Sequence, residues 1–184
     1  MRKPGIVALP ALLPLLLCLP RTAAAQAPEY EVKATILERL TGFVEWPPEA
    51  LDNSSQVFDV CVFGTNPFGS ILEEVFADER VAGRPVVVRH VADVSELDPC
   101  RLLFIGGTDA ETASRVLLRT RGRAVLTVSD RAGFTSRGVL VTLELAQRRV
   151  QLVVNETAVR ESGLRMSHLL LGMARIVNPY ARRP

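Results

Sequence analysis

Residues that could catalyse a reaction are few and lie far apart in the sequence. The two histidines, His90 and His168, are flanked neither by a nucleophile elbow nor by a paired-histidine zinc motif. A hydrolase needs a nucleophile beside a base, and no such pair stands out. Asp59 lies within an apolar segment, where a carboxylate could have unusual acidity, although an edge position or a hydrogen-bonded cap is the ordinary explanation. We therefore predict that the protein is not an enzyme.

Three polar loops follow predicted strands, where open α/β sheets bind ligands. They span residues 64–69, 106–109 and 129–131. The first has neither a dinucleotide fingerprint nor a P-loop. In the second, Thr108 or Asp109 is expected to cap a helix, although the same loop could hold an anion. The third could hold a ligand or be a plain turn. We predict no cofactor, and keep a small-ligand site in the first two loops, or a flavin, as alternatives.

Charged residues that could bind a partner or a ligand gather in the last third of the chain. Arg160, Glu161, Arg165 and His168 lie in a polar stretch between apolar segments, with Arg165 and His168 expected about one helical turn apart. Arginine can bind carboxylate or phosphate in two-point contact, and histidine responds to pH. A solvated loop with helix-capping roles is the alternative.

Two cysteines, Cys61 and Cys100, remain after the predicted leader, which contains Cys18. An even number of cysteines in an exported chain predicts a disulfide, and two buried free thiols are the alternative. A metal site is not expected, because neither cysteine has a second ligand at the usual spacing. A disulfide would require the strands at Cys61 and Cys100 to be neighbours.

The first 25 residues have the three parts of a cleavable signal peptide. Arg2 and Lys3 precede an apolar stretch over residues 6–19, and Ala23 and Ala25 fit a cleavage site after Ala25. A transmembrane anchor is the alternative, but a bilayer core needs about 20 apolar residues. Attachment as a lipoprotein through Cys18 is a second alternative. We predict a periplasmic protein with one domain over residues 26–184.

The charge of the mature chain gives no reason to expect nucleic-acid binding. Without the leader's three basic residues, 19 of the 22 basic residues remain against 20 acidic ones. The local cluster of Arg115, Arg119, Arg121 and Arg123 has helical spacing, which is typical of a solvated helix face.

Strand and helix patterns alternate along the chain. Strands are expected at residues 58–63, 85–91, 102–105, 124–128, 139–145 and 150–154. Helices are expected at residues 30–44, 68–77, 93–97, 109–119, 157–161 and 167–177. This order predicts an α/β fold: a mixed, mostly parallel sheet covered by helices on both faces, with an antiparallel C-terminal hairpin at one edge.

Seven motifs in collinear order resemble the YfiR family of periplasmic proteins. They are residues 30–34 (YEVKA), 43–47 (FVEWP), 61–64 with 66–69 (CVFG, NPFG), 83–86 (GRPV), 100–106 (CRLLFIG), 125–130 with 133–134 (VLTVSD, GF), and 163–167 with 169–170 and 174–177 (GLRMS, LL, ARIV). Each motif alone is weak, but the seven together span nearly the whole mature chain.

The resemblance implies a repressor that binds the periplasmic sensor domain of an inner-membrane diguanylate cyclase. Such a protein would hold down cyclic-di-GMP output and biofilm formation, would form a homodimer and could be released by an outer-membrane lipoprotein. By position, Cys61 and Cys100 would form the structural disulfide, and residues 160–168 would lie at the partner or ligand surface. A second cysteine pair, present in some relatives, is absent here, and the particular cyclase is not implied.

Overall fold

A computed structural model describes residues 23–51 and 56–178 of the chain. Its main sheet contains eight strands in the order β10-β8-β7-β6-β5-β2-β4-β3. Their bounds are β2 (Phe58–Phe63), β3 (Arg80–Val81), β4 (Arg84–Val91), β5 (Cys100–Ile105), β6 (Leu126–Ser129), β7 (Val141–Ala146), β8 (Arg149–Asn155) and β10 (Arg175–Val177). Neighbouring strands are parallel except in the pairs β7–β8 and β3–β4.

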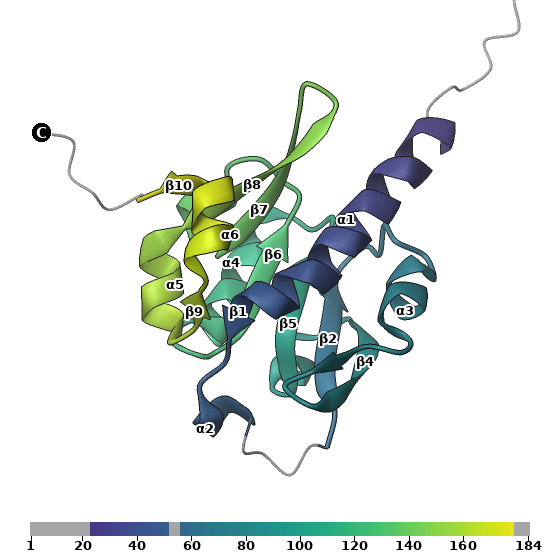
Figure 1. Cartoon of the computed structure of the whole chain (residues 1–184). Helices are drawn as coiled ribbons and strands as arrows, with labels where there is room; N and C mark the ends of the chain where they lie inside the picture. The colour runs from purple at the N-terminus through teal and green to yellow at the C-terminus, as the bar shows by residue number, and fades with distance from the viewer. Residues whose placement is uncertain (1–22, 52–55, 179–184) are drawn as a thin grey trace, which may run out of the picture.

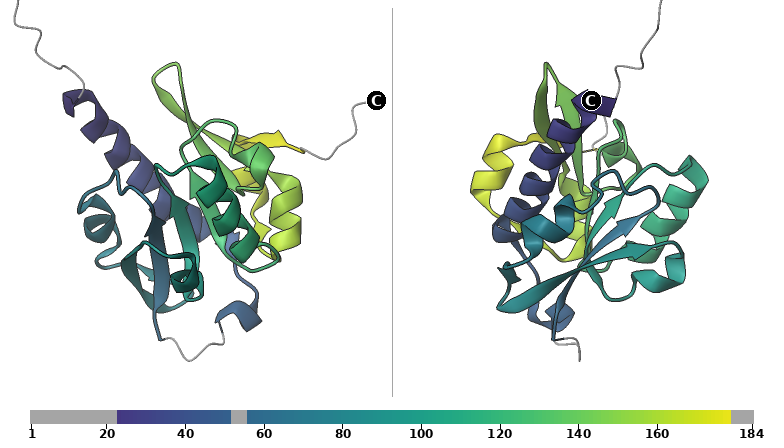
Figure 2. Two further views of the ribbon diagram at one scale, coloured as in Figure 1. Left: turned by 180° about the vertical axis from the view of Figure 1, so that it is seen from behind. Right: turned by 90° about the vertical axis from the view of Figure 1, so that its right-hand side faces the viewer.

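Helices cover both faces of this sheet, as predicted (Figures 1 and 2). The α-helices are α1 (Ala23–Phe43), α2 (Pro48–Leu51), α3 (Ile71–Phe76), α4 (Ala110–Thr120), α5 (Glu156–Ser162) and α6 (His168–Met173). Two 3-10 turns, η1 (Val94–Leu97) and η2 (Thr135–Arg137), and a two-stranded sheet of β1 (Val44–Glu45) and β9 (Arg165–Met166) complete the described part of the fold.

The core divides into two layers because the central strands are buried on both faces. On one side, α1 and α3 pack against the sheet through Ala34, Leu37, Leu40, Leu72 and Phe76. On the other side, η1 and α4 cover it through Leu97, Ala113 and Val116. The apolar stripe that predicted the first helix is the face that contacts the sheet.

The order β4-β2-β5 confirms that the strands at Cys61 and Cys100 are neighbours. A capping box begins η1: the Asp93 side chain accepts from the backbone of the turn, and the Glu96 side chain accepts from the Asp93 amide.

The last predicted helix, residues 167–177, is wrong in its second half. Helix α6 ends at Met173, Ala174 has extended backbone angles, and Arg175–Val177 form β10 parallel to β8. The helix ends early because Gly172 weakens it. The strand forms because its pairing gives the backbone of β8 a hydrogen-bonded neighbour. Consequently β10, and not the hairpin, is the edge strand.

Other boundaries differ from the prediction in smaller ways. Helix α1 begins at Ala23 and not at Tyr30, so it includes the last residues of the predicted leader. The rest of that leader lies outside the described residues, and cleavage after Ala25 stays a prediction. The hairpin turn is shorter than predicted, with only Gln147 and Arg148 between β7 and β8. The short strands β1, β3 and β9 were not predicted.

Candidate functional site

The loops after β2 and β5 leave toward opposite faces of the sheet, where open α/β sheets usually bind ligands. Here the two loops are joined. Thr65 and Gly107 form a backbone bridge, and the Thr65 hydroxyl donates to the Gly107 carbonyl oxygen at 3.1 Å. A Cβ atom on Gly106 would lie 2.1 Å from the Thr65 carbonyl oxygen. The loops therefore touch backbone to backbone and close the crevice between them.

Asp109, also in the loop after β5, caps α4. Its Oδ1 accepts hydrogen bonds from the amides of Glu111 and Thr112, both at 2.9 Å. The bond from the Thr112 amide is the main cause that holds the pKa of Asp109 below its ordinary value. The predicted cap is confirmed, and Asp109 occupies the amides that could have held an anion.

Asp130, directly after β6, anchors α1 to the sheet. Its Oδ2 accepts hydrogen bonds from the Tyr30 hydroxyl and the Lys33 ammonium, both at 2.8 Å. Lys33 is buried and also pairs with Glu29 at 2.5 Å. Burial, followed by the hydrogen bond to Asp130, raises the pKa of Tyr30 well above its ordinary value. The placement of Lys33 one turn before Leu37, on the core-facing stripe, is the sequence signal that could have revealed this contact.

The network borders an open depression of about 700 Å³, which the loops after β2 and β5 also line through Thr65, Gly69 and Gly107. Tyr30, Phe68, Asp130 and Arg131 are among the residues that line it. The turn at residues 129–131, one of the predicted ligand loops, thus faces an open depression, but Asp130 already binds two groups of α1.

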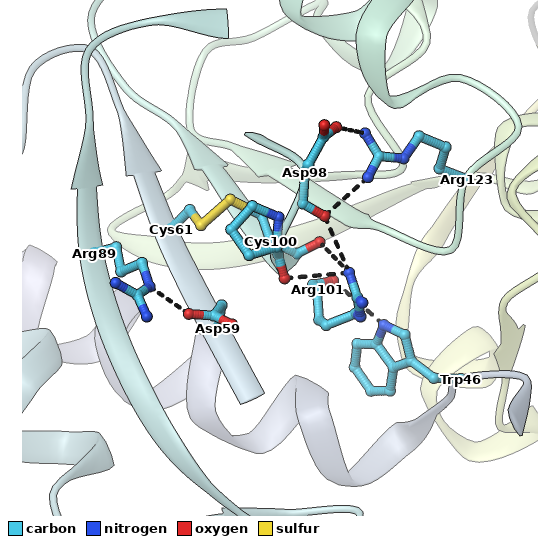
Figure 3. Close-up of a disulfide and its surroundings, with 9 residues drawn as sticks. Trp46, Asp59, Cys61, Arg89, Asp98, Cys100, Arg101 and Arg123 are labelled. Atoms are coloured by element: carbon cyan, nitrogen blue, oxygen red, sulfur yellow. Dashed lines mark hydrogen bonds and ion pairs between the residues drawn. A yellow bond between two sulfur atoms is a disulfide. The ribbon is translucent and has the colours of Figure 1, made fainter. Parts of the chain in front are cut away.

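Cys61 and Cys100 form the predicted disulfide, which links β2 to β5 with their Cα atoms 5.8 Å apart (Figure 3). Both cysteines are buried beneath η1 and α4. Next to them, the guanidinium of Arg101 donates to the carbonyl oxygens of Asp98, Pro99 and Cys100, and the Trp46 indole donates to the Arg101 carbonyl. The disulfide therefore lies in a fixed structural environment.

The buried carboxylate of Asp59 forms an ion pair with Arg89 of the neighbouring strand β4 (Figure 3). Asp59 lies in a central strand and pairs with a side chain, so neither expected explanation, an edge position or a hydrogen-bonded cap, is correct. The ion pair with Arg89 gives the buried carboxylate a structural partner.

Among the described residues, no group of three or more acidic, cysteine or histidine side chains could hold a metal ion.

The four residues predicted to bind a partner lie on successive elements and do not form one contact cluster. Arg160 and Glu161 are on α5, Arg165 is on β9, and His168 is the first residue of α6. Arg165 donates to Glu45 of β1 at 2.6 Å, and Glu161 pairs with Arg121 at 3.4 Å. Within the described parts of the chain, no hydrogen bond or ion pair joins any two of the four.

The sequence predicted that Arg165 and His168 lie about one helical turn apart, and this prediction is wrong. The β1–β9 pairing holds Arg165 in an extended strand, and Ser167 caps α6 through the Leu170 amide, so the helix begins only at His168. The pairing also brings Glu45, 120 residues away, beside Arg165. No local pattern in the sequence could have indicated that contact.

Large apolar side chains lie exposed next to His168. On α6, Leu169 is 63% exposed and Met173 is 58% exposed, while Leu170 between them is buried in the core. Ile176 of β10 is also exposed. The sequence interpretation treated this helix as a core element and missed its apolar outer side. We call His168, Leu169 and Met173 of α6, together with Arg165 of β9 just before this helix in the sequence, the α6 surface.

A family model described as YfiR/HmsC-like matches residues 30–175. The chain belongs to the YfiR/HmsC-like family. The match confirms the resemblance carried by the seven motifs. It includes the disulfide, the Tyr30, Lys33 and Asp130 contacts, and the α6 surface.

The family match supports a periplasmic regulator of a diguanylate cyclase at the level of the family, and a regulatory role in place of an enzymatic one. None of the helices in the described residues is sufficiently long and apolar to cross a bilayer.

Proposed function

We propose that this protein is a periplasmic repressor that binds the sensor domain of an inner-membrane diguanylate cyclase and lowers its cyclic-di-GMP output. The family match over residues 30–175 is the observation that carries this proposal. A homodimer and release by an outer-membrane lipoprotein are further parts of it. Inhibition requires that the protein bind one conformation of the sensor domain more tightly than the other.

The α6 surface supports binding to another protein. Exposed Leu169 and Met173 offer apolar contact area, and His168 begins the same helix. Protein interfaces typically combine an apolar centre with a polar rim and are rich in methionine and arginine. We therefore assign the partner contact to this surface and include Arg160 and Glu161 of α5 at its border.

The alternative, a small-ligand protein without a cyclase partner, receives less support. The Thr65–Gly107 bridge joins the loops after β2 and β5, which leaves a ligand only the open depression that these loops share with Asp130. Asp109 and Asp130 in the adjoining loops already bind the protein's own amides, hydroxyl and ammonium groups.

Replacement of Arg165 by glutamate tests the proposed contact. Arg165 and Glu45 are 82% and 70% exposed, and exposed ion pairs contribute little to stability, so the fold should remain intact. We expect Arg165→Glu to weaken co-purification of the cyclase about tenfold, which is about 1.4 kcal/mol. It should also raise cellular cyclic-di-GMP relative to wild type.

Arg115→Glu on α4 is the matched control, because Arg115 is also exposed but lies on the opposite face of the sheet. This variant should bind the cyclase as wild type does. Equal recovery with Arg165→Glu would remove the α6 surface from the interface. A wild-type bait that recovers no cyclase from solubilised membranes would refute the proposed function itself.

A further inference from the structure

A second surface lies between the first half of α1 and the tip of the β7–β8 hairpin. Both elements project beyond the body of the domain and diverge (Figures 1 and 2). The groove between them has a volume of about 770 Å³. Val32 and Ile36 of α1 line one wall, and Leu145 and Val150 of the hairpin line the other.

The lining of this groove is apolar and open to water. Val32 is 49% exposed and Leu145 is 56% exposed, although either side chain could have been polar without loss to the core. Facing apolar walls that rise outside the core, with charged residues at the rim, are typical of a surface that another molecule covers.

The rim of the groove carries the positive charges of Arg148 and Arg149. Gln147 and Arg148 have φ angles of 50° and 63°, which form the tight turn and place Arg148 and Arg149 at the hairpin tip. Neither arginine has an ion pair or side-chain hydrogen bond within the described residues. On the α1 side, the charge of Glu29 is already paired with Lys33.

We propose that this groove binds an acidic amphipathic helix of the partner's sensor domain. Apolar side chains of that helix would pack between Val32 and Leu145, and its carboxylates would pair with Arg148 and Arg149. The inference rests on the proposed function and adds a second contact, separate from the α6 surface, with a defined partner chemistry.

Two properties of the groove favour a helix over other occupants. One wall is α1, whose backbone groups are satisfied within the helix, so an occupant contacts this wall through side chains, as an amphipathic helix does. The groove is concave, with walls from two separate elements, whereas a lipid bilayer offers a flat surface. Two unpaired arginines at the rim select carboxylates on the occupant.

A photo-crosslinking residue at Leu145, in the exported full-length chain, tests the contact directly. We expect a crosslink to a periplasmic segment of the cyclase in which apolar residues recur at helical spacing beside Asp or Glu. The same crosslinker at Leu118 is the control, because Leu118 is 71% exposed but lies on α4. It should give no cyclase adduct.

The double variant Arg148→Glu/Arg149→Glu tests the role of charge. It should weaken cyclase co-purification about tenfold without changing the melting temperature, whereas Arg115→Glu should not weaken it. If wild type recovers the cyclase and the double variant recovers it equally, the groove is not the contact but the proposed function stands. If wild type recovers no cyclase, both proposals fail.

Other occupants give distinct results, and each would overturn the inference. A Leu145 adduct with a second copy of this chain would make the groove a self-interface. Sedimentation of wild type, but not of Arg148→Glu/Arg149→Glu, with vesicles of phosphatidylglycerol and phosphatidylethanolamine would make it a membrane contact.

Discussion

At the scale of single residues, the buried charges of this protein serve the fold. Asp59 and Lys33 are both buried, and each pairs with an opposite charge from another element. The sequence identified Asp59 as unusual because it interrupts an apolar strand. It could not identify Arg89 as the partner, because that pairing depends on the parallel register of β2 and β4.

Carboxylates that cap helices make the stability depend on pH. The Thr112 amide and its neighbours hold the pKa of Asp109 below its ordinary value. A depressed carboxyl pKa stabilises the folded state above the unfolded-state pKa, which is about 4, and this contribution is lost as the pH falls through the folded-state value.

Asp109→Asn should therefore reduce the loss of stability between neutral pH and about pH 3, because asparagine caps helices without titrating. Melting temperatures of the two proteins, measured across this range, check the prediction. Glu111→Gln is the control, because Glu111 is in the same turn but accepts no capping bond through its side chain. Parallel pH profiles for wild type and Asp109→Asn would contradict it.

At the scale of elements, sequence patterns predicted the central strands better than the end of the chain. β2 and β5 are continuous apolar runs bounded by turn residues, so their positions follow from local composition. The apolar residues of the α6–β10 segment follow a pattern that is typical of a helix. Arg175–Val177 form a strand only because they pair with β8, which is distant in the sequence. The hairpin was predictable for the opposite reason, since its two strands are adjacent in the sequence.

Neighbouring leucines on α6 should respond differently to truncation. Leu170→Ala should lower the free energy of unfolding by about 2–5 kcal/mol, because it leaves a cavity in the core. Leu169→Ala should change it by less than about 0.5 kcal/mol, since Leu169 faces water. Chemical denaturation of both variants measures the difference.

The two variants also separate stability from binding. Leu169→Ala should reduce cyclase recovery although the fold is intact. Equal unfolding free energies for Leu169→Ala and Leu170→Ala would show that α6 is not docked as described.

At the scale of the whole molecule, one covalent constraint predicted the centre of the topology. The predicted pairing of Cys61 with Cys100 required β2 and β5 to be neighbours, as they are in the order β4-β2-β5. The order of strands and loops predicted the ligand edge of the sheet but not the contact between Gly106 and Thr65, because that contact depends on how two distant loops meet. The charged stretch at residues 160–168 was identified, but the exposed side of α6 and the contact with Glu45 depend on tertiary packing.

Removal of the disulfide should destabilise the whole domain. The cysteines are 39 positions apart, and in the chain-entropy model a loop of that length contributes about 4 kcal/mol. Cys61→Ser/Cys100→Ser should therefore lower the free energy of unfolding by an amount of this order in urea titrations.

Wild type that has been unfolded and refolded in reductant is the matched control and should behave like the double variant. An unchanged melting temperature in the double variant would rule out a structural role for the bond.

Because η1 and α4 cover the disulfide, its burial should slow its reduction. A thiol reagent in the periplasm can reach the disulfide only after η1 and α4 open locally. The rate of reduction should therefore equal the opening rate, and should not depend on the reagent concentration when the reagent is in excess. The disulfide would then stay intact during brief reducing conditions and would be reduced only when those conditions last longer than the opening time.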